Sequence, residues 1–214
     1  MLTARLNAQQ VINAYTANAW IYDLWAWLTE SRARKIAMRY AAVRNGEEIL
    51  EVAVGTGLSF RELLVQNPAG MTHGVDLTPA MLERARQKVV NVEGKYSLEI
   101  GNAHQLAYSS KSVDLLVNNY MFDLMREEEF VPLLEEFSRI VKSGGRMVLT
   151  NMAEPRRIWH SLWQLVYRIN PKWMGGCRGV SLAAYITKAG LQVESHSYVS
   201  QFGFPSEIIL VRNP

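Results

Sequence analysis

The feature that most constrains the fold is the stretch from Ile49 to Gly57, which reads Ile-Leu-Glu-Val-Ala-Val-Gly-Thr-Gly. Its apolar run is too short for a helix and rich in β-branched residues, and a helical pattern follows it at 58–65. This order predicts a buried strand, a tight glycine turn and a helix N-terminus. Glycine has no Cβ and tolerates a positive φ, so a ligand can approach the turn closely and face the free N–H groups of the helix.

A dinucleotide-binding loop follows the pattern G-x-G-x-x-G/A, which needs a third small residue. Counted from Gly55, that third position holds Phe60, and counted from Ala53 it holds Leu58. Both frames fail, so a dinucleotide is not the expected ligand. A strand–turn–helix connection that binds no ligand is the alternative interpretation of this stretch taken alone.

Further apolar runs along the chain repeat the pattern of a strand followed by a turn and a helix. The run 72–77 ends in an acid, Asp76, which lies 25 residues beyond Glu51. Thr78-Pro79 then suits the N-cap and the first position of a helix at 80–90. Strands and helices that alternate at this spacing predict repeated βα units. Later in the chain, Gly144 is predicted to end the helix before the run at 146–151.

From about residue 49 to residue 151, the chain resembles class I S-adenosylmethionine-dependent methyltransferases. Motif I of that family is an acid followed by G-x-G-x-G, and here it reads Glu51-Val-Ala-Val-Gly-Thr-Gly57, with Ala53 in place of the first glycine. The resemblance implies an α/β, Rossmann-like sheet of seven strands in the order 3-2-1-4-5-7-6, with the last strand antiparallel. The expected strands are 49–54, 72–77, 96–101, 113–118, 146–151, 191–198 and 206–212.

The resemblance also implies that S-adenosylmethionine is the methyl donor and S-adenosylhomocysteine the product. Glu51 would lie near the amino-acid end of this cofactor, Asp76 would hold the ribose, and Leu77 would pack on the adenine. The family usually has an acid that accepts a hydrogen bond from the adenine amino group; here Asn102 offers an amide oxygen instead. The expected cofactor-binding residues are Glu51, Ala53, Gly55, Thr56, Gly57, Asp76, Leu77, Met81, Asn102, Ala103, Asn118 and Asn119.

The N-terminal region reads as helical, with separate helices expected at 2–14 and 31–43. Between them, Tyr15 to Asp23 resembles the Tyr-x-x-x-Ala-x-x-Tyr-Asp element of a subgroup that contains ubiquinone/menaquinone methyltransferases and bacterial phosphatidylethanolamine N-methyltransferases. In such enzymes this element folds over the cofactor and its aromatic residues help to shape the acceptor site. Residues 1–44 are therefore expected to form a helical lid, and residues 45–214 the methyltransferase domain, with a cap insertion at about 154–180.

The expected chemistry needs little from the protein beyond alignment, because the methyl group of a sulfonium is already electrophilic. A general base is needed only if the acceptor arrives protonated. The candidates for catalysis are Tyr15, Tyr22, His104, Tyr120 and Asp123, with His160 as a further candidate base. Asn118, Asn119 and Tyr120 are expected to flank the methyl group.

The segment 156–178 contains five basic residues, three tryptophans and no acid. A basic amphipathic segment with tryptophan can lie on a membrane surface, and the alternative is a cap helix whose tryptophans pack on the domain. Together with this segment, the resemblance to the quinone and phospholipid subgroup implies a small lipophilic acceptor, such as a phospholipid amine head group or a quinone-like ring. Two alternatives stay open, namely a soluble small-molecule acceptor and a protein that binds the cofactor without catalysis.

Charge, histidine and cysteine content, and the length of apolar runs indicate which partners to expect. The net charge is +3 and the basic residues are spread along the chain, so no nucleic-acid partner is expected. The four histidines and the single cysteine form no metal-binding motif. No apolar run approaches the ~18 residues of a membrane span, and no secretory signal pattern begins the chain. A cytoplasmic protein is expected, with contact at the inner face of the membrane through 156–178 left open.

Overall fold

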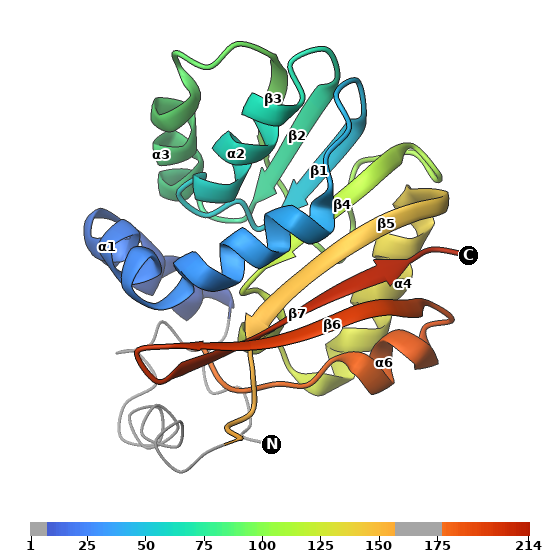
Figure 1. Cartoon of the computed structure of the whole chain (residues 1–214). Helices are drawn as coiled ribbons and strands as arrows, with labels where there is room; N and C mark the ends of the chain where they lie inside the picture. The colour runs from blue at the N-terminus through green and yellow to red at the C-terminus, as the bar shows by residue number, and fades with distance from the viewer. Residues whose placement is uncertain (1–7, 157–176) are drawn as a thin grey trace.

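The computed structural model describes residues 8–156 and 177–214, and in the first helix it describes the side chains of residues 23, 24 and 26–41. Seven strands form one sheet in the order β3-β2-β1-β4-β5-β7-β6 (Figure 1). Strands β1 to β5 pair in parallel, and β7 pairs antiparallel with β5 and β6. The predicted α/β fold, the strand order and the antiparallel last strand are confirmed.

The strands are β1 Glu48–Val52, β2 Met71–Asp76, β3 Lys95–Ile100, β4 Val113–Asn119, β5 Val141–Met152, β6 Gln192–Gln201 and β7 Phe204–Arg212. The helices are α1 Ala8–Ala41, α2 Leu58–Gln66, α3 Pro79–Val89, α4 Phe130–Ile140 and α6 Ala183–Lys188, with short 3-10 turns η1 Phe122–Leu124 and η2 Glu127–Glu129.

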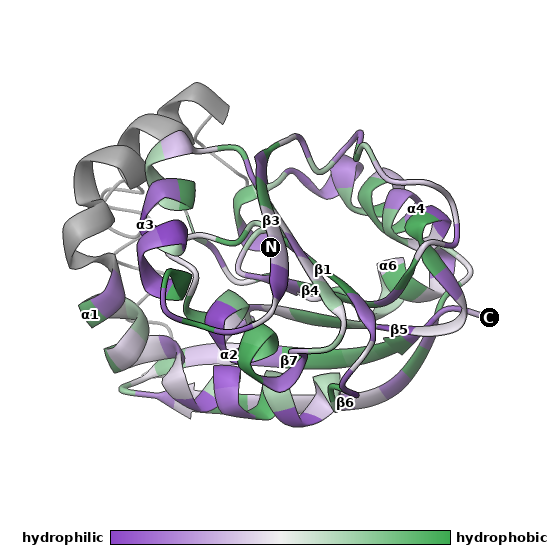
Figure 2. Cartoon of the chain, turned by 90° about the horizontal axis from the view of Figure 1, so that it is seen from above, coloured by the Kyte–Doolittle hydropathy of each residue, from purple (hydrophilic) through white to green (hydrophobic). Residues whose placement is uncertain are grey.

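Helices cover both faces of the sheet. Helices α1, α2 and α3 lie on one face, and α4 and α6 lie on the other (Figure 1). On the first face, Ala33, Ala37 and Ala41 of α1 belong to a buried cluster with residues of β4, β5 and β7. The small side chains let the helix lie close to the sheet. Figure 2 shows β4, β5 and β7 largely in the hydrophobic colour, as expected of strands that are covered on both sides.

Two local predictions are wrong. The N-terminal region forms one continuous helix of 34 residues, rather than separate helices at 2–14 and 31–43. Gly144 does not end a helix, because α4 stops at Ile140 and the chain passes directly into β5. Val141 already pairs with Val113, and the register then shifts before Arg146 pairs with Leu115. Gly144 takes a φ of 73° inside this irregularity and donates its N–H to Asn213.

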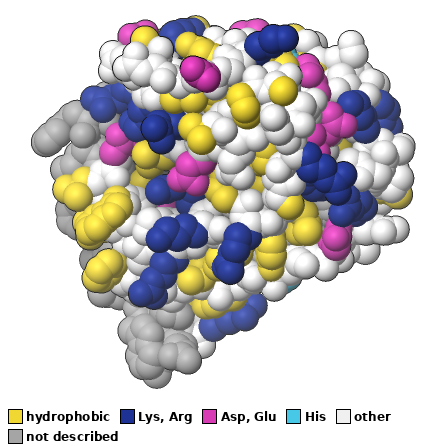
Figure 3. Space-filling model, turned by 45° about the horizontal axis from the view of Figure 1, so that its top comes forward, with side chains coloured by type: hydrophobic (Ala, Val, Ile, Leu, Met, Phe, Trp, Pro, Cys, Tyr) yellow, Lys and Arg dark blue, Asp and Glu magenta, His cyan; other side chains and the backbone are white. Residues whose placement is uncertain are grey.

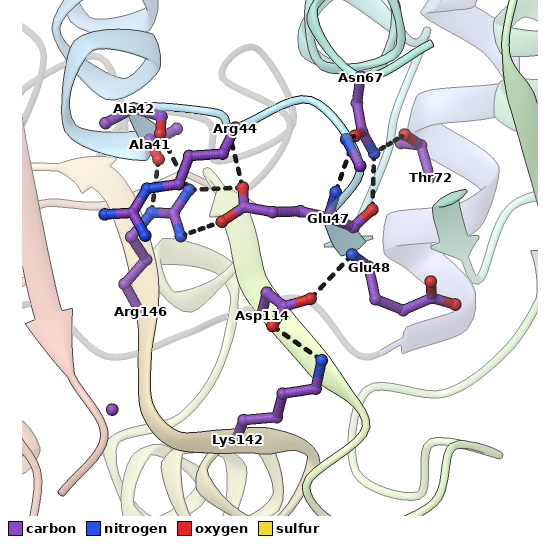
Figure 4. Close-up of polar contacts among 12 residues, drawn as sticks. Ala41, Ala42, Arg44, Glu47, Glu48, Asn67, Thr72, Asp114, Lys142 and Arg146 are labelled. Carbon is purple, nitrogen blue, oxygen red and sulfur yellow. Dashed lines mark hydrogen bonds and ion pairs between the residues drawn. The ribbon is translucent and has the colours of Figure 1, made fainter. Parts of the chain in front are cut away.

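Arg146 fastens the C-terminal end of α1 to the sheet (Figure 4). Its Nε donates to the carbonyl oxygen of Ala41 at 2.6 Å, and its Nη2 donates to that of Ala42 at 3.1 Å. Both Nη atoms also bind the carboxylate of Glu47, each at 2.8 Å. The last carbonyl groups of a helix have no partner within the helix, so this arginine satisfies two of them and fixes where α1 ends.

The visible surface is mixed in character. Figure 3 shows Lys and Arg side chains distributed over one face, with acidic and hydrophobic side chains between them. Among the described residues, no helix combines the length and the apolar character that crossing a bilayer requires. The cap predicted at 154–180 and the basic segment 156–178 fall mainly on residues outside the described ranges, as does His160.

Candidate active site

The loop after β1 bends sharply at three residues with positive φ. These are Ala53 at 61°, Gly55 at 57° and Gly57 at 83°. Ala53 therefore holds a left-handed conformation that costs a non-glycine residue roughly 1–2 kcal/mol. A Cβ on Gly57 would lie 2.8 Å from the Cα of Ala85, so the glycine is what allows α2 and α3 to pack this closely. The predicted strand, glycine turn and helix are present.

Asp76 braces this loop from the end of β2. One carboxylate oxygen accepts the N–H of Gly55 at 2.8 Å, and the other accepts the N–H of Thr78 at 2.8 Å. The residue is only 9 % exposed, and burial raises its pKa although these N–H groups oppose the shift. An ionised carboxylate offers about four acceptor sites, which it can share between these N–H groups and a ligand.

A cavity lies in front of this loop, at the carboxyl ends of β1, β2 and β4. It holds about 760 Å³ of space free of protein atoms, part of it open to solvent. Nine of the residues predicted for the site line it: Ala53, Gly55, Asp76, Leu77, Met81, Asn102, Ala103, Asn119 and Tyr120. In an open α/β sheet this edge, where the strand order reverses, is the usual place for a ligand.

A second cavity adjoins the first, because the two share Ala53, Gly55, Asn119 and Tyr120 as lining residues. Its other walls come from Glu51 and Thr56 near the glycine loop and from Glu30 and Arg34 on α1. Helix α1 also touches the loop directly. The hydroxyl of Thr56 donates to Asp23 at 2.6 Å, and Asp23 pairs with Lys88 of α3 at 2.5 Å.

Glu51 lines the second cavity with a buried carboxylate, of which only one oxygen has a hydrogen-bond partner. It is 1 % exposed, and its Oε1 accepts a bond of 3.3 Å from the side-chain amide of Asn119. Its Oε2 is buried without a partner. Desolvation raises its pKa well above the ordinary value. A buried acceptor of this kind calls for a cationic or hydrogen-donating ligand group.

Tyr120 and Asn102 line the first cavity with polar atoms already engaged. The hydroxyl of Tyr120 shares a hydrogen bond of 2.8 Å with Ser206, and burial raises its pKa well above 10. The side-chain oxygen of Asn102 accepts the N–H of His104 at 3.0 Å, which leaves it one further acceptor site.

Other predicted residues lie outside both cavities. Asn118 is fully buried and donates to the carbonyl oxygen of Val52 at 2.8 Å, which links β4 to β1. Asp123 is fully buried, accepts the N–H of Met152 at 3.2 Å, and has its pKa raised to about 7 by burial. His104 pairs with Glu129 at 3.2 Å. Gly57 begins α2 behind the loop.

Tyr15 and Tyr22 lie on α1, but their side chains are outside the described part of the structure. The sequence analysis missed Glu30 and Arg34 on the same helix, and also the apolar wall formed by Met121, Leu124 and Met125. Glu30 could have been noticed, because it interrupts a buried stripe that includes Ala26, Ala33 and Ala37 at helical spacing. The apolar wall comes from an irregular segment that has no such periodicity.

Comparison with known proteins finds a matching family model and related enzymes. Residues 49–145 match the family model described as a methyltransferase domain. The chain is 26 % identical over 184 residues to a ubiquinone/menaquinone biosynthesis C-methyltransferase of Geobacter sp., covering 82 % of this chain and 77 % of the relative. It is 33 % identical over 134 residues to a phosphatidylethanolamine N-methyltransferase of Cereibacter sphaeroides, covering 61 % of this chain and 63 % of that relative.

A solved structure supports the same fold. The methyltransferase in a Haloferax volcanii complex with the activator Trm112 has a TM-score of 0.76 and 19 % identity, with 97 % of this chain and 98 % of that chain covered. Family model, relatives and fold agree with the glycine loop and the acid at the end of β2. The family model, the relatives and the fold together support a class I S-adenosylmethionine-dependent methyltransferase with S-adenosylmethionine as its cofactor, similar to the quinone and phosphatidylethanolamine enzymes.

Proposed function

We propose that this chain transfers the methyl group of S-adenosylmethionine to a lipophilic ring that carries a hydroxyl group, of the quinol type. The observation that carries the proposal is the wall of the first cavity after β4, where Met121, Leu124 and Met125 present apolar side chains. Methionine adapts its shape to irregular apolar ligands. The similarity to a ubiquinone/menaquinone biosynthesis C-methyltransferase, which spans 82 % of this chain, favours a ring as the acceptor.

The residues of the cavities suit the cofactor. We assign the ribose to the acceptor sites of Asp76 and the adenine to the apolar side chains of Leu77 and Met81. The ammonium group of the cofactor would satisfy the unpartnered Oε2 of Glu51. When bound, the cofactor supplies an electrophilic methyl group, and the protein holds the acceptor in line with it. Such alignment can contribute on the order of 7–11 kcal/mol to catalysis.

A phospholipid amine is the second candidate acceptor, because the phosphatidylethanolamine N-methyltransferase is 33 % identical over 134 residues. An amine acceptor would place its lipid chains on the same apolar wall, and the similarity to the quinone enzyme over 82 % of this chain favours the ring over the amine. Contact with a membrane surface through 156–178 remains a prediction, and either acceptor would be delivered from a bilayer.

The proposal is tested by following a labelled methyl group. The protein is incubated with S-adenosylmethionine labelled in its methyl carbon and with one of two vesicle preparations. The first holds a prenylated naphthoquinol that lacks a ring methyl group, and the second holds phosphatidylethanolamine alone. We expect label in the quinol and not in the phospholipid. Label in phosphatidylethanolamine would show that the acceptor is the amine and not the ring. Label in neither molecule would contradict a lipophilic acceptor.

A further inference from the structure

We infer that Glu30 of α1 is the catalytic base that accepts the proton of the methyl acceptor. The inference rests on the proposed function, and it is carried by the position of one carboxylate. Glu30 lines the second cavity together with Glu51, Asn119 and Tyr120, and the last two residues also line the first cavity. Glu30 therefore lines the cavity that adjoins the one assigned to the nucleoside, and we place the meeting point of acceptor and methyl donor where the two cavities join.

Contacts with β6 hold the turn of α1 that carries Glu30. One residue of β6, Gln201, binds the turn of α1 that carries Glu30 from both sides. The side-chain oxygen of Gln201 accepts the N–H of Arg32 at 2.8 Å, and its amide nitrogen donates to the carbonyl oxygen of Trp27 at 2.9 Å. Bonds of 3.2 and 3.0 Å join it to the hydroxyl of Ser31 as well. These bonds fix the backbone from which the Glu30 side chain extends, and positioning of this kind lowers the entropy cost of engaging a substrate.

Glu30 is poised to take up a proton. It is 8 % exposed, and no hydrogen bond or ion pair to its carboxylate occurs within the described ranges. The ionisable groups that face it are Arg34 on α1, Glu51 on β1, Tyr120 after β4 and Asp123 in η1. Burial, and then the charge of Asp123, raise the pKa of Glu30 to about 8, while Arg34 opposes the shift.

Arg34 does not neutralise Glu30, because its Nε binds Glu62 at 2.9 Å. Glu51, the other carboxylate of the cavity, already accepts a hydrogen bond from Asn119 and is assigned to the ammonium group of the cofactor. Asp123 lines neither cavity. Glu30 is therefore the carboxylate that is left for the acceptor.

The reaction balances with Glu30 as the proton acceptor. The hydroxyl group of the ring gives its proton to the carboxylate, and the electron pair left on oxygen enters the ring. A ring carbon then bonds to the methyl carbon, while the S–CH3 bond breaks and its electrons stay on sulfur. The same ring carbon finally releases its proton to water, which restores the aromatic ring as a phenolate. The Glu30 carboxyl group then returns its proton to that oxygen, so that the hydroxyl group and the free carboxylate are both regenerated. A base with a pKa near 8 is well matched to a phenol, whose pKa lies near 10.

The test compares Glu30→Gln with Glu83→Gln, which removes an exposed carboxylate of α3 that pairs with Arg86 and lines neither cavity. We expect Glu30→Gln to lower kcat on the naphthoquinol by roughly 10²–10⁴-fold, the usual contribution of a general base. The affinity of Glu30→Gln for S-adenosylhomocysteine should change less than about threefold, and Glu83→Gln should keep most of the activity. In the wild-type protein kcat should rise with pH and level off above about 8, and Glu30→Gln should lack this rise.

Folding is monitored in the same samples. The native protein binds the Glu30 proton more tightly than the unfolded chain, so this carboxylate destabilises the fold increasingly from about pH 4.5 to about pH 8. The melting temperature of Glu30→Gln at pH 8 should therefore equal or exceed that of the wild type. A variant that keeps kcat within threefold, or keeps the pH rise, overturns the inference. If the wild-type protein methylates phosphatidylethanolamine instead, the ring proposal is wrong, and the role of Glu30 is tested by the same comparison of variants with that amine as acceptor. If the protein methylates neither acceptor, both the proposed function and the role of Glu30 are contradicted.

Discussion

Replacing Asp76 by alanine is expected to weaken the binding of S-adenosylmethionine by 100-fold or more. The substitution removes the acceptor sites assigned to the ribose, and it leaves the N–H groups of Gly55 and Thr78 without their partner. A hydrogen bond to a charged group contributes about 1.5–3 kcal/mol. Losing two such bonds to the ribose corresponds to roughly 10²–10⁴ in affinity, since about 1.4 kcal/mol is tenfold.

Calorimetric titration with S-adenosylhomocysteine measures this loss. The matched control is Asp114→Ala, at the opposite end of the sheet. Asp114 also accepts a backbone N–H, from Glu48 at 2.9 Å, and it pairs with Lys142 at 2.8 Å (Figure 4). That variant should bind the cofactor product as tightly as the wild type. An affinity of Asp76→Ala within threefold of the wild type would mean that the ribose lies elsewhere.

The second large effect is expected on stability. Arg146→Met should lower the free energy of unfolding by about 3 kcal/mol or more, which is the usual cost of removing one partner from a buried ion pair. The side chains of Arg146 and Glu47 are 10 % and 12 % exposed. The substitution leaves the Glu47 carboxylate unpaired in this site, and it takes the partner from the carbonyl groups of Ala41 and Ala42 that end α1 (Figure 4).

Denaturant unfolding at several pH values tests this. The control is Arg212→Met, whose pair with Glu194 is more exposed, at 37 % and 43 %, and should contribute less than about 1 kcal/mol. The ion pair with Arg146 holds the pKa of Glu47 below its ordinary value of 4.5. Its stabilisation is therefore present above that value and lost as the pH falls through the lower, folded pKa. A pH-independent difference, or one no larger than that of Arg212→Met, would contradict the role of this pair.

The sheet and the cofactor loop could be predicted from sequence because their determinants are local. A short β-branched run followed by Gly-Thr-Gly specifies a strand and a turn, and the acid at position 76 marks where the next strand ends. Parallel strands then bring these ends to one edge of the sheet. Of the seventeen residues named for cofactor binding or catalysis, fifteen are described with their side chains, and nine of these line one cavity.

What the sequence left unpredicted depends on contacts between distant segments. Glu30 enters the site only because α1 is one unbroken helix whose course is set by Gln201 and Arg146, more than 100 residues away. Asn118 lies at the end of β4 as expected, but the alternation of the strand turns it towards Val52 and away from the cavity that Asn119 lines. Gly144 is a residue type that often ends a helix, but the strand pairing of Val141 with Val113 ends the helix before Gly144 is reached.

The most direct test of this account is a crystal structure of the protein with S-adenosylhomocysteine. We predict the nucleoside in the cavity in front of the glycine loop, with its ribose hydroxyl groups on Asp76, its ammonium group on Glu51, and its sulfur facing Asn119 and Glu30. A cavity that stays empty at saturating ligand, or a nucleoside bound away from Asp76, would contradict it.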